Sequence, residues 1–284
     1  MPIKTRYLIK LTHYAIDLGN TALKVLCQHP ETQQVERLHQ WLLADVGIEP
    51  LAKKLQLWRK TLPKEALVAW VSTNPTVEAT LFQHINTADF VPLNKHHLLK
   101  CATNGGINFT YYQASWDTIG IDRVLNMLQL ASQFPTETSV LINAGSATTI
   151  DILMNGKTYG GGAILPSIAS WQQALPQQAP HLPLPLPLND TDSFHPPTST
   201  EEAITHGVGY TYAMGILAYA QQLAHYWKSP ITKIVVTGGY SAWLHHALEA
   251  SLKLGLFTTS QPSLIFDEHW YNNAIFTQFK NENS

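Results

Sequence analysis

Apolar residues recur in two rhythms along the chain, one typical of strands and one typical of helices. Two short apolar runs flank a polar turn at residues 19–21 within the segment 14–28, which predicts a β-hairpin. A buried strand is predicted over 66–73 and an amphipathic helix over 122–134. This alternation of strands and helices favours the α/β class.

The second half of the chain repeats the opening pattern about 125 residues later. An apolar strand runs into a small-residue turn at 143–148, and a second strand, an Asn-Gly hairpin and a glycine bend follow. A third strand, a Gly-Gly turn and a helix are predicted over 231–252. We therefore expect two related lobes, residues 1–118 and 119–284, each led by a hairpin.

Other stretches predict helices and connections. Residues 41–60 and 201–227 have helical spacing, whereas 101–113 are rich in loop-forming residues. Seven of the 17 prolines lie within 176–197, and repeated Leu-Pro pairs disfavour a helix or a central strand there. We expect this Pro-rich segment to be an extended excursion from the second lobe.

Composition narrows the class of protein. Charged residues make up 13% of the chain against about 25% in an average domain, and the formal net charge is -2. Such a chain has no basic field that favours nucleic acid or an anionic membrane. Two cysteines, Cys27 and Cys101, are too few for a disulfide framework. Because the first residues also lack the apolar core of a signal peptide, and no apolar run is long enough for a membrane span, we expect a soluble cytoplasmic protein.

Three glycine-containing turns, at 17–21, 143–148 and 237–240, each follow an apolar strand. Glycine lets a ligand approach the backbone, and hydroxyl or amide side chains donate hydrogen bonds to anionic oxygens. Asp17 at a strand end is suited to Mg²⁺, and Lys24 is placed to reach a phosphate. The P-loop and the G-x-G-x-x-G of dinucleotide-binding folds are both missing from the sequence.

Two pairs of adjacent histidines do not predict a zinc site. In His96 with His97, and in His245 with His246, neighbouring side chains do not share a helix face as they do in H-x-x-x-H. We identify no acidic partner at a useful spacing. The sequence therefore predicts no metal bound by histidine.

Five short motifs, in this order, resemble those of the type III pantothenate kinases, the family that includes the Bvg accessory factors. They are D-x-G-N-T-x-x-K (17–24), G-x-D-R (120–123), x-x-G-S-A-x-T-x-D (143–151), G-G-x-I-x-P (161–166) and T-G-G (237–239). The resemblance covers about residues 14–245. It implies the superfamily of acetate and sugar kinases, chaperones and actin, with two ribonuclease-H-like lobes and a nucleotide cleft between them.

The resemblance also implies an activity, the first step of coenzyme A biosynthesis. ATP, bound with Mg²⁺, would phosphorylate pantothenate on its terminal hydroxyl to give 4'-phosphopantothenate. Asp17 would lie near the metal. The resemblance implies that residues of the three turns bind ATP and its phosphates. They are Asp17, Gly19, Asn20, Thr21, Lys24, Gly145, Ser146, Ala147, Thr148, Gly238 and Gly239.

Within G-x-D-R the resemblance makes Asp122 the catalytic base and assigns pantothenate binding to Gly120, Ile121 and Arg123. A helix N-terminus keeps a carboxylate ionised, and an ionised carboxylate can accept the hydroxyl proton as the oxygen attacks the γ-phosphorus. Taken without the resemblance, Asp122 is simply a helix N-terminal residue paired with Arg123.

Two further residues are implied to touch pantothenate. Thr200 resembles the threonine that reaches the substrate across a homodimer interface, and it is also placed to be a helix N-cap. Tyr111 or Tyr112 resembles the tyrosine that lines the pocket, and we take Tyr112 as the candidate.

The chain departs from the family pattern at several positions. Asn143 stands where an Asp usually coordinates a monovalent cation such as K⁺ or NH₄⁺; its amide oxygen can still ligate a cation but lacks the negative charge. Ser146 replaces the usual Thr and keeps the hydroxyl, Ser167 stands in place of Gly, and Trp116 stands in place of Pro. These changes indicate a divergent member and leave open whether its activity is weak, altered in cation dependence or lost.

The sequence thus predicts a pantothenate kinase that acts as a homodimer, and two alternatives stay open. One is a non-catalytic, regulatory protein on the same fold, which Asn143 favours. The other is a kinase for a different acceptor alcohol. Retention of Asp17, Lys24, Asp122 and Arg123 favours the enzyme.

Overall fold

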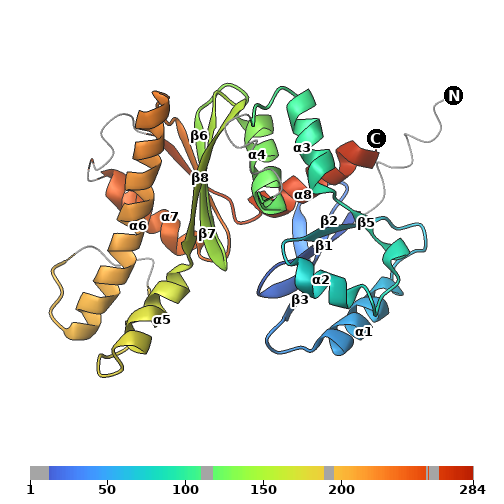
Figure 1. Cartoon of the computed structure of the whole chain (residues 1–284), viewed down its shortest axis with the longest axis horizontal. Coiled ribbons are helices and arrows are strands. Elements are labelled where there is room, and N and C mark those ends of the chain that lie inside the picture. Colours follow the sequence, from blue (N-terminus) through green and yellow to red (C-terminus); the bar gives the residue numbers. More distant parts are fainter. Residues whose placement is uncertain (1–12, 110–117, 189–194, 254, 256–261, 284) are drawn as a thin grey trace. The chain divides into compact units, whose positions relative to one another are not determined.

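The computed structural model describes residues 13–109, 118–188, 195–253, 255 and 262–283 (Figure 1). Its contacts divide the chain into two compact units. Unit 1 contains Met1–Cys101, Thr118–Leu125 and Tyr271–Ser284, and unit 2 contains Ala102–Asp117 and Asn126–Trp270. Unit 1 is thus assembled from the beginning, the middle and the end of the chain. The division into lobes at 118 and 119 stays a prediction.

Unit 1 is built on a five-stranded mixed sheet in the order β3-β2-β1-β4-β5. Strands β1 and β2 form the predicted antiparallel hairpin, β3 extends it, and β4 runs parallel to β1. The strands are β1 (His13–Leu18), β2 (Ala22–Gln28), β3 (Val35–Leu42), β4 (Val68–Ser72) and β5 (Val91–Pro92). Because β1 is the central strand, its residues from Ala15 to Leu18 are all buried.

The first half of the chain contributes three helices: α1 (Ile48–Arg59), α2 (Pro75–Leu81) and α3 (Lys95–Asn104). Helix α1 packs Leu51, Leu55 and Trp58 against the sheet in the spacing of a single helix face. The helix predicted over 41–60 is therefore wrong at its start, because the chain up to Leu42 pairs with β2 instead. The loop predicted over 101–113 is also wrong at its start, because α3 continues to Asn104.

Unit 2 contains a second five-stranded sheet, in the order β10-β9-β6-β7-β8, with the same pattern of strand directions as unit 1. The strands are β6 (Ser139–Ala144), β7 (Ala147–Met154), β8 (Thr158–Pro166), β9 (Lys233–Thr237) and β10 (Ser263–Phe266). Central strands β1 and β6 are offset by 126 residues, from 13 to 139 and from 18 to 144. The predicted internal repeat is confirmed.

The remaining helices are α4 (Ile121–Gln133), α5 (Ile168–Gln178), α6 (Thr200–Trp227), α7 (Ser241–Lys253) and α8 (Trp270–Asn283). Helix α6 packs Ile216, Leu217 and Ala220 into the core of unit 2. The predicted long helix over 201–227 is confirmed, whereas α8 was not predicted. None of the described helices is both long enough and apolar enough to cross a bilayer.

Two local predictions need correction. The Pro-rich excursion begins later than residue 176, because Pro176 lies in the last turn of α5, where the missing N–H costs the helix one hydrogen bond. The glycine bend is part of strand β8 rather than a bend. A Cβ at Gly162 would lie 1.8 Å from the Ile150 carbonyl oxygen, so glycine is needed there for the strands to approach.

Candidate functional site

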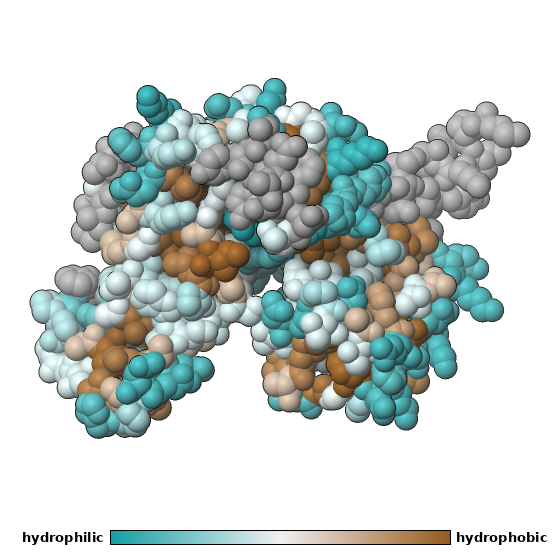
Figure 2. All heavy atoms as spheres, in the orientation of Figure 1, coloured by the Kyte–Doolittle hydropathy of each residue, from teal (hydrophilic) through white to brown (hydrophobic). Residues whose placement is uncertain are grey.

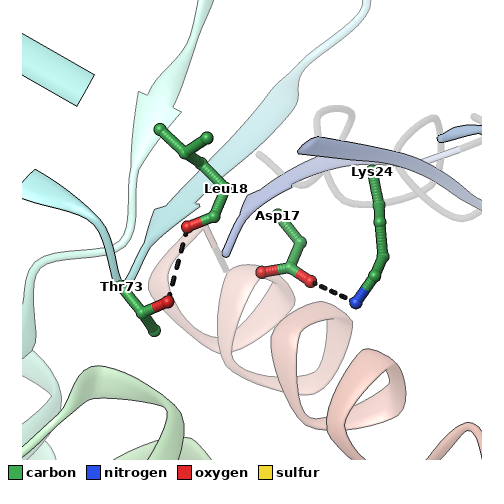
Figure 3. Close-up of polar contacts among 4 residues, drawn as sticks. All are labelled: Asp17, Leu18, Lys24 and Thr73. Atoms are coloured by element: carbon green, nitrogen blue, oxygen red, sulfur yellow. Dashed lines mark hydrogen bonds and ion pairs between the residues drawn. The ribbon is translucent and has the colours of Figure 1, made fainter. Parts of the chain in front are cut away.

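The β1–β2 hairpin places Asp17 directly opposite Lys24. In the antiparallel register the two residues are partners, so their side chains leave the sheet on the same face. The Lys24 Nζ donates to Asp17 Oδ2 at 3.2 Å (Figure 3). Asp17 is only 3% exposed, whereas the Lys24 side chain is 35% exposed. The end of the central strand thus carries an enclosed carboxylate beside a cation that solvent or a ligand can reach.

The turn after Asp17 leaves open space above its backbone. The Gly19 N–H donates to the Ala22 carbonyl at 2.9 Å, and the side chains of Asn20 and Thr21 are exposed. A Cβ at Gly19 would meet only the Ala22 oxygen, at an ordinary 3.5 Å. The packing of the protein therefore does not require glycine here, and the turn can admit a ligand close to the backbone.

A hydrogen bond from the neighbouring strand holds this end of β1. The Leu18 carbonyl accepts from the Thr73 N–H at 2.9 Å and from the Thr73 hydroxyl at 3.5 Å (Figure 3). Thr73 directly follows β4. The turn at 19–21 is therefore held by hydrogen bonds on both sides of β1, to Ala22 of β2 on one side and to Thr73 on the other.

The second acidic residue of the predicted site, Asp122, lies in the first turn of α4. Its carboxylate folds back over Gly120, where a Cβ would lie 2.3 Å from Asp122 Oδ1. The Gly120 carbonyl accepts the first helical hydrogen bond, from the Val124 N–H at 3.2 Å. Arg123, the next residue, is only 4% exposed. The G-x-D spacing therefore gives the carboxylate room beside the helix N-terminus, which stabilises its charge.

Sequence reasoning missed a third residue, Tyr271, near the start of α8. Helix α8 passes the Asp17–Lys24 pair (Figure 3). The Tyr271 hydroxyl is closed off from solvent and has no hydrogen-bond partner among the described residues. Burial raises the pKa of Tyr271 well above its ordinary value, and the charges of Asp17 and Asp122 raise it further. Unit 1 thus brings two carboxylates and a protonated phenol together from three distant segments, and no local pattern in the sequence signals the phenol.

The second glycine-containing turn joins β6 to β7 in unit 2. The Gly145 N–H donates to the Ala147 carbonyl at 3.1 Å, and the side chains of Ser146 and Ala147 are exposed. Thr148 differs from them because it is 1% exposed and its hydroxyl accepts a hydrogen bond from the Tyr212 hydroxyl. Burial raises the pKa of Tyr212. In this structure Thr148 therefore ties the turn to α6.

Parallel pairing of β6 with β9 brings the third turn beside the second. The Tyr240 N–H donates to the Ala144 carbonyl at 3.0 Å, and Gly238 has a φ of 99°. A Cβ at Gly238 would lie 2.6 Å from that carbonyl group and 2.7 Å from Asn143 Oδ1, whereas a Cβ at Gly239 would meet nothing within 4 Å. Asn143 thus presents an amide oxygen where the two turns meet.

The predicted pantothenate contacts outside unit 1 stay predictions. Thr200 is exposed at the first position of α6. The prediction that Thr200 is the N-cap is wrong by one residue, because the Ser199 hydroxyl accepts from the Glu202 N–H at 3.1 Å. Thr198 in turn donates twice to the Glu202 carboxylate, which lowers the pKa of that group. Tyr111, Tyr112 and Trp116 lie outside the described residues.

One prediction about the histidines is incomplete. On α7 the carboxylate of Glu249 comes within reach of both His245 and His246, and one ligand atom from each of the three lies within 4.8 Å of the others. This carboxylate stands four residues after His245 and three after His246, so an acidic partner at a useful spacing is present after all.

Three curated proteins illustrate the sequence similarity of this chain. A 28% identical protein from Legionella pneumophila (strain Corby) matches over 169 residues, 59% of this chain and 62% of its own length. One from Pseudoalteromonas translucida is 25% identical over 74% of this chain and 89% of its own length. A third, from Helicobacter pylori, is 31% identical over 55% of this chain and 65% of its own length. Each is named a type III pantothenate kinase. The match thus spans less than two thirds of the Legionella and Helicobacter proteins.

Solved structures share the fold over nearly the whole chain. A Campylobacter jejuni protein assigned as a Baf family transcriptional activator has a TM-score of 0.53 at 19% identity and covers 95% of this chain and 98% of its own. A Listeria monocytogenes protein assigned as an N-acetylmannosamine kinase has a TM-score of 0.51 at 12% identity and covers 96% of this chain and 100% of its own. The expected α/β fold, with two actin-like lobes each built on a five-stranded mixed sheet, is confirmed.

The family itself is identified by a family model that matches most of the chain. The model that describes the type III pantothenate kinases matches residues 14–222, which include the Asp17–Lys24 hairpin, Asp122 and the second turn. The chain therefore belongs to the type III pantothenate kinase family.

Proposed function

We propose that this chain transfers the γ-phosphoryl group of ATP to the terminal hydroxyl of pantothenate. Membership of the family supports the substrate pair, and the arrangement in unit 1 supports catalysis. The observation that carries the proposal is the convergence of Asp17, Lys24 and Asp122 in one compact unit, with an enclosed carboxylate, a reachable cation and a carboxylate at a helix N-terminus. Phosphoryl transfer depends mainly on such positioning and charge.

Asp122 is the base in this proposal. Its carboxylate accepts the hydroxyl proton while the pantothenate oxygen bonds to the γ-phosphorus and the bond to the β-phosphate bridging oxygen breaks, so that ADP leaves. The helix N-terminus keeps Asp122 ionised at the start of the reaction. We assign pantothenate binding to Gly120, Ile121 and Arg123, of which Arg123 is only 4% exposed.

The first turn holds the phosphates. Lys24 offsets the charge that builds up on the leaving oxygen, and the backbone at Gly19, with the side chains of Asn20 and Thr21, contacts phosphate oxygens. Asp17 fits a site for Mg²⁺, which is usually held by one or two carboxylates together with substrate phosphates. When bound, Mg²⁺ would orient the phosphates and neutralise part of their charge. The other residues proposed to bind ATP, all in unit 2, are Gly145, Ser146, Ala147, Thr148, Gly238 and Gly239.

A monovalent cation, K⁺ or NH₄⁺, belongs at Asn143. Its Oδ1 lies beside the backbone of both turns, and an uncharged oxygen suits a singly charged ion better than Mg²⁺. Because the amide lacks the charge of a carboxylate, the cation binds more weakly than it would to Asp.

We also propose that the enzyme is a cytoplasmic homodimer in which Thr200 reaches the partner's substrate. Thr200 is exposed on α6, and a segment with two exposed leucines is tied to the same helix. Leu184 is 71% exposed and Leu186 is 44% exposed. The Leu186 N–H donates a hydrogen bond to the Thr205 hydroxyl of α6 at 2.8 Å, which holds this segment against the helix. Figure 2 shows hydrophobic atoms at the surface around α5, which precedes this segment. An exposed apolar patch on a folded protein is typical of a protein–protein interface.

The decisive experiment measures ADP release with ATP, Mg²⁺ and pantothenate in Na⁺, K⁺ and NH₄⁺ buffers. We expect pantothenate-dependent turnover that Asp122→Asn reduces by about 10²-fold or more, in line with the loss of general base catalysis. The control Asp45→Asn removes an exposed carboxylate of unit 1 and should leave the rate unchanged. We expect Asn143→Asp to strengthen the response to K⁺.

Two outcomes would point to the alternatives. A folded protein that binds ATP·Mg²⁺ but turns over no pantothenate, and whose thermal stabilisation by the two ligands is merely additive, would be a non-catalytic descendant. Turnover with another alcohol in place of pantothenate would identify a kinase of a different specificity. Equal activity in Asp122→Asn would remove that residue from the role of base.

A further inference from the structure

We infer that helix α7 carries a surface site for a divalent transition-metal ion, with Zn²⁺ as its first candidate. The ligands are His245, His246 and Glu249, and one ligand atom from each lies within 4.8 Å of the other two. This site is separate from the residues assigned to ATP, Mg²⁺ and pantothenate.

The helix explains why three side chains so close in sequence meet in space. Glu249 is four residues after His245 and three after His246, and both spacings place side chains on neighbouring positions of a helix surface. The two imidazole rings have their centroids 5.8 Å apart and their planes at an angle of 83°. A pair of adjacent histidines that lacks a carboxylate does not form such a group.

The donor set selects the kind of metal. Two imidazole nitrogens and one carboxylate oxygen suit Zn²⁺, Cu²⁺ or Ni²⁺, whereas Mg²⁺ and Ca²⁺ prefer oxygen ligands alone. Three ligands leave a fourth tetrahedral position for water. Ligand atoms around a tetrahedral Zn²⁺ lie about 3.3 Å apart, so binding requires the side chains to draw together.

The surroundings allow this movement. His246 is exposed and the Glu249 side chain is 45% exposed, so both can change rotamer without disturbing the core. His245 is half-buried and packs against Phe266 at a ring distance of 5.7 Å, which holds one ligand in place. Lys253 competes for the carboxylate, because its Nζ lies 3.1 Å from Glu249 Oε1. Such an exposed pair is weak, and a divalent ion should displace it.

The test is a calorimetric titration of the tag-free, full-length protein with Zn²⁺ after removal of metals by a chelator. We expect one Zn²⁺ per chain, with binding unaffected by excess Mg²⁺. The variants His246→Gln and Glu249→Gln should each weaken Zn²⁺ binding by about tenfold or more. Loss of a residue that only orients a metal ligand already costs about tenfold, and loss of a ligand should cost at least as much. Lys253→Met should tighten binding by about twofold, because it removes the competing cation.

A matched control comes from the other adjacent pair, on α3. Among the described residues, His96 and His97 belong to no group of three metal-binding side chains, so His97→Gln should leave the affinity unchanged. With Cu²⁺ as the probe, electron paramagnetic resonance should show two nitrogen ligands in the wild type and one in His246→Gln. Equal Zn²⁺ affinity in the wild type, His246→Gln and Glu249→Gln would overturn the site, whatever the kinase assay gives.

Discussion

The Tyr271 hydroxyl has no hydrogen-bond partner among the described residues although it is closed off from solvent. A buried polar group without a partner costs free energy, and such a group often binds a water molecule, an ion or a ligand. Burial and the charges of Asp17 and Asp122 raise the pKa of Tyr271, which keeps the phenol protonated and able to donate. In the proposed reaction it is therefore suited to donate to a phosphoryl or hydroxyl oxygen of a substrate.

Tyr271→Phe separates this role from a structural one. We expect the free energy of unfolding to stay the same or to rise, because the substitution removes an unsatisfied polar atom and keeps the ring. We expect kcat for pantothenate phosphorylation to fall by about tenfold to a hundredfold, as when a donor to the reacting oxygens is lost. Urea unfolding and steady-state kinetics measure both. The control is Tyr226→Phe, at an exposed tyrosine of α6; a Tyr271→Phe enzyme with an unchanged kcat would contradict the assignment.

At the scale of elements, the glycines of the three turns are of two kinds: the fold requires some of them and does not require others. Gly238 has a φ of 99°, and a Cβ there would lie 2.6 Å from the Ala144 carbonyl group. Gly19 has room for a Cβ, with the nearest atom at 3.5 Å. If phosphates approach both turns, the fold itself explains the glycine at 238, whereas contact with the ligand is the main reason for the glycine at 19.

Alanine substitutions therefore give opposite results at the two positions. Gly238→Ala should lower the free energy of unfolding by about 1–3 kcal/mol, the usual cost of such backbone strain. Gly19→Ala should leave it unchanged or slightly raised, since alanine restricts the unfolded chain. It should still weaken ATP·Mg²⁺ binding, because the methyl group occupies the space above the turn. Denaturation and nucleotide titration measure the two effects, and an unaltered ATP affinity in Gly19→Ala would argue against phosphate at that turn.

Elements that depend on local signals were predicted well, and elements that depend on distant partners were not. The β1–β2 hairpin and the long helix α6 follow from strand alternation and from a long apolar helical pattern. Strand β3 was not predicted, because its residues are mostly exposed and it forms by pairing with β2. Asp17, Lys24 and Asp122 were found through their motifs, whereas Tyr271 has no motif and joins them only through the fold.

At the scale of the whole molecule, the first hairpin and the last helix meet in unit 1, and no local pattern predicts this. Helix α8 returns to the first hairpin: the Phe279 ring packs edge-on against His13 at 6.3 Å, and Lys280 Nζ donates to Gln33 Oε1 at 2.5 Å. Tyr271 reaches the carboxylates only because α8 docks in this way. The stability of this docking therefore bears on the proposed site as well as on the fold.

This docking should weaken in acid. Burial, and then the charge of Lys280, lowers the pKa of His13 below the ordinary 6.5. Below about pH 6.5 the unfolded chain therefore binds a proton at His13 more readily than the folded chain does, so folding stability decreases as the pH falls through this range. His13→Gln removes the titrating group and should flatten this part of the profile. Urea midpoints at about pH 5.5 and about pH 7.5 measure the effect. The exposed His84→Gln is the control, and equal pH slopes in wild type and His13→Gln would show that His13 does not couple the docking of α8 to pH.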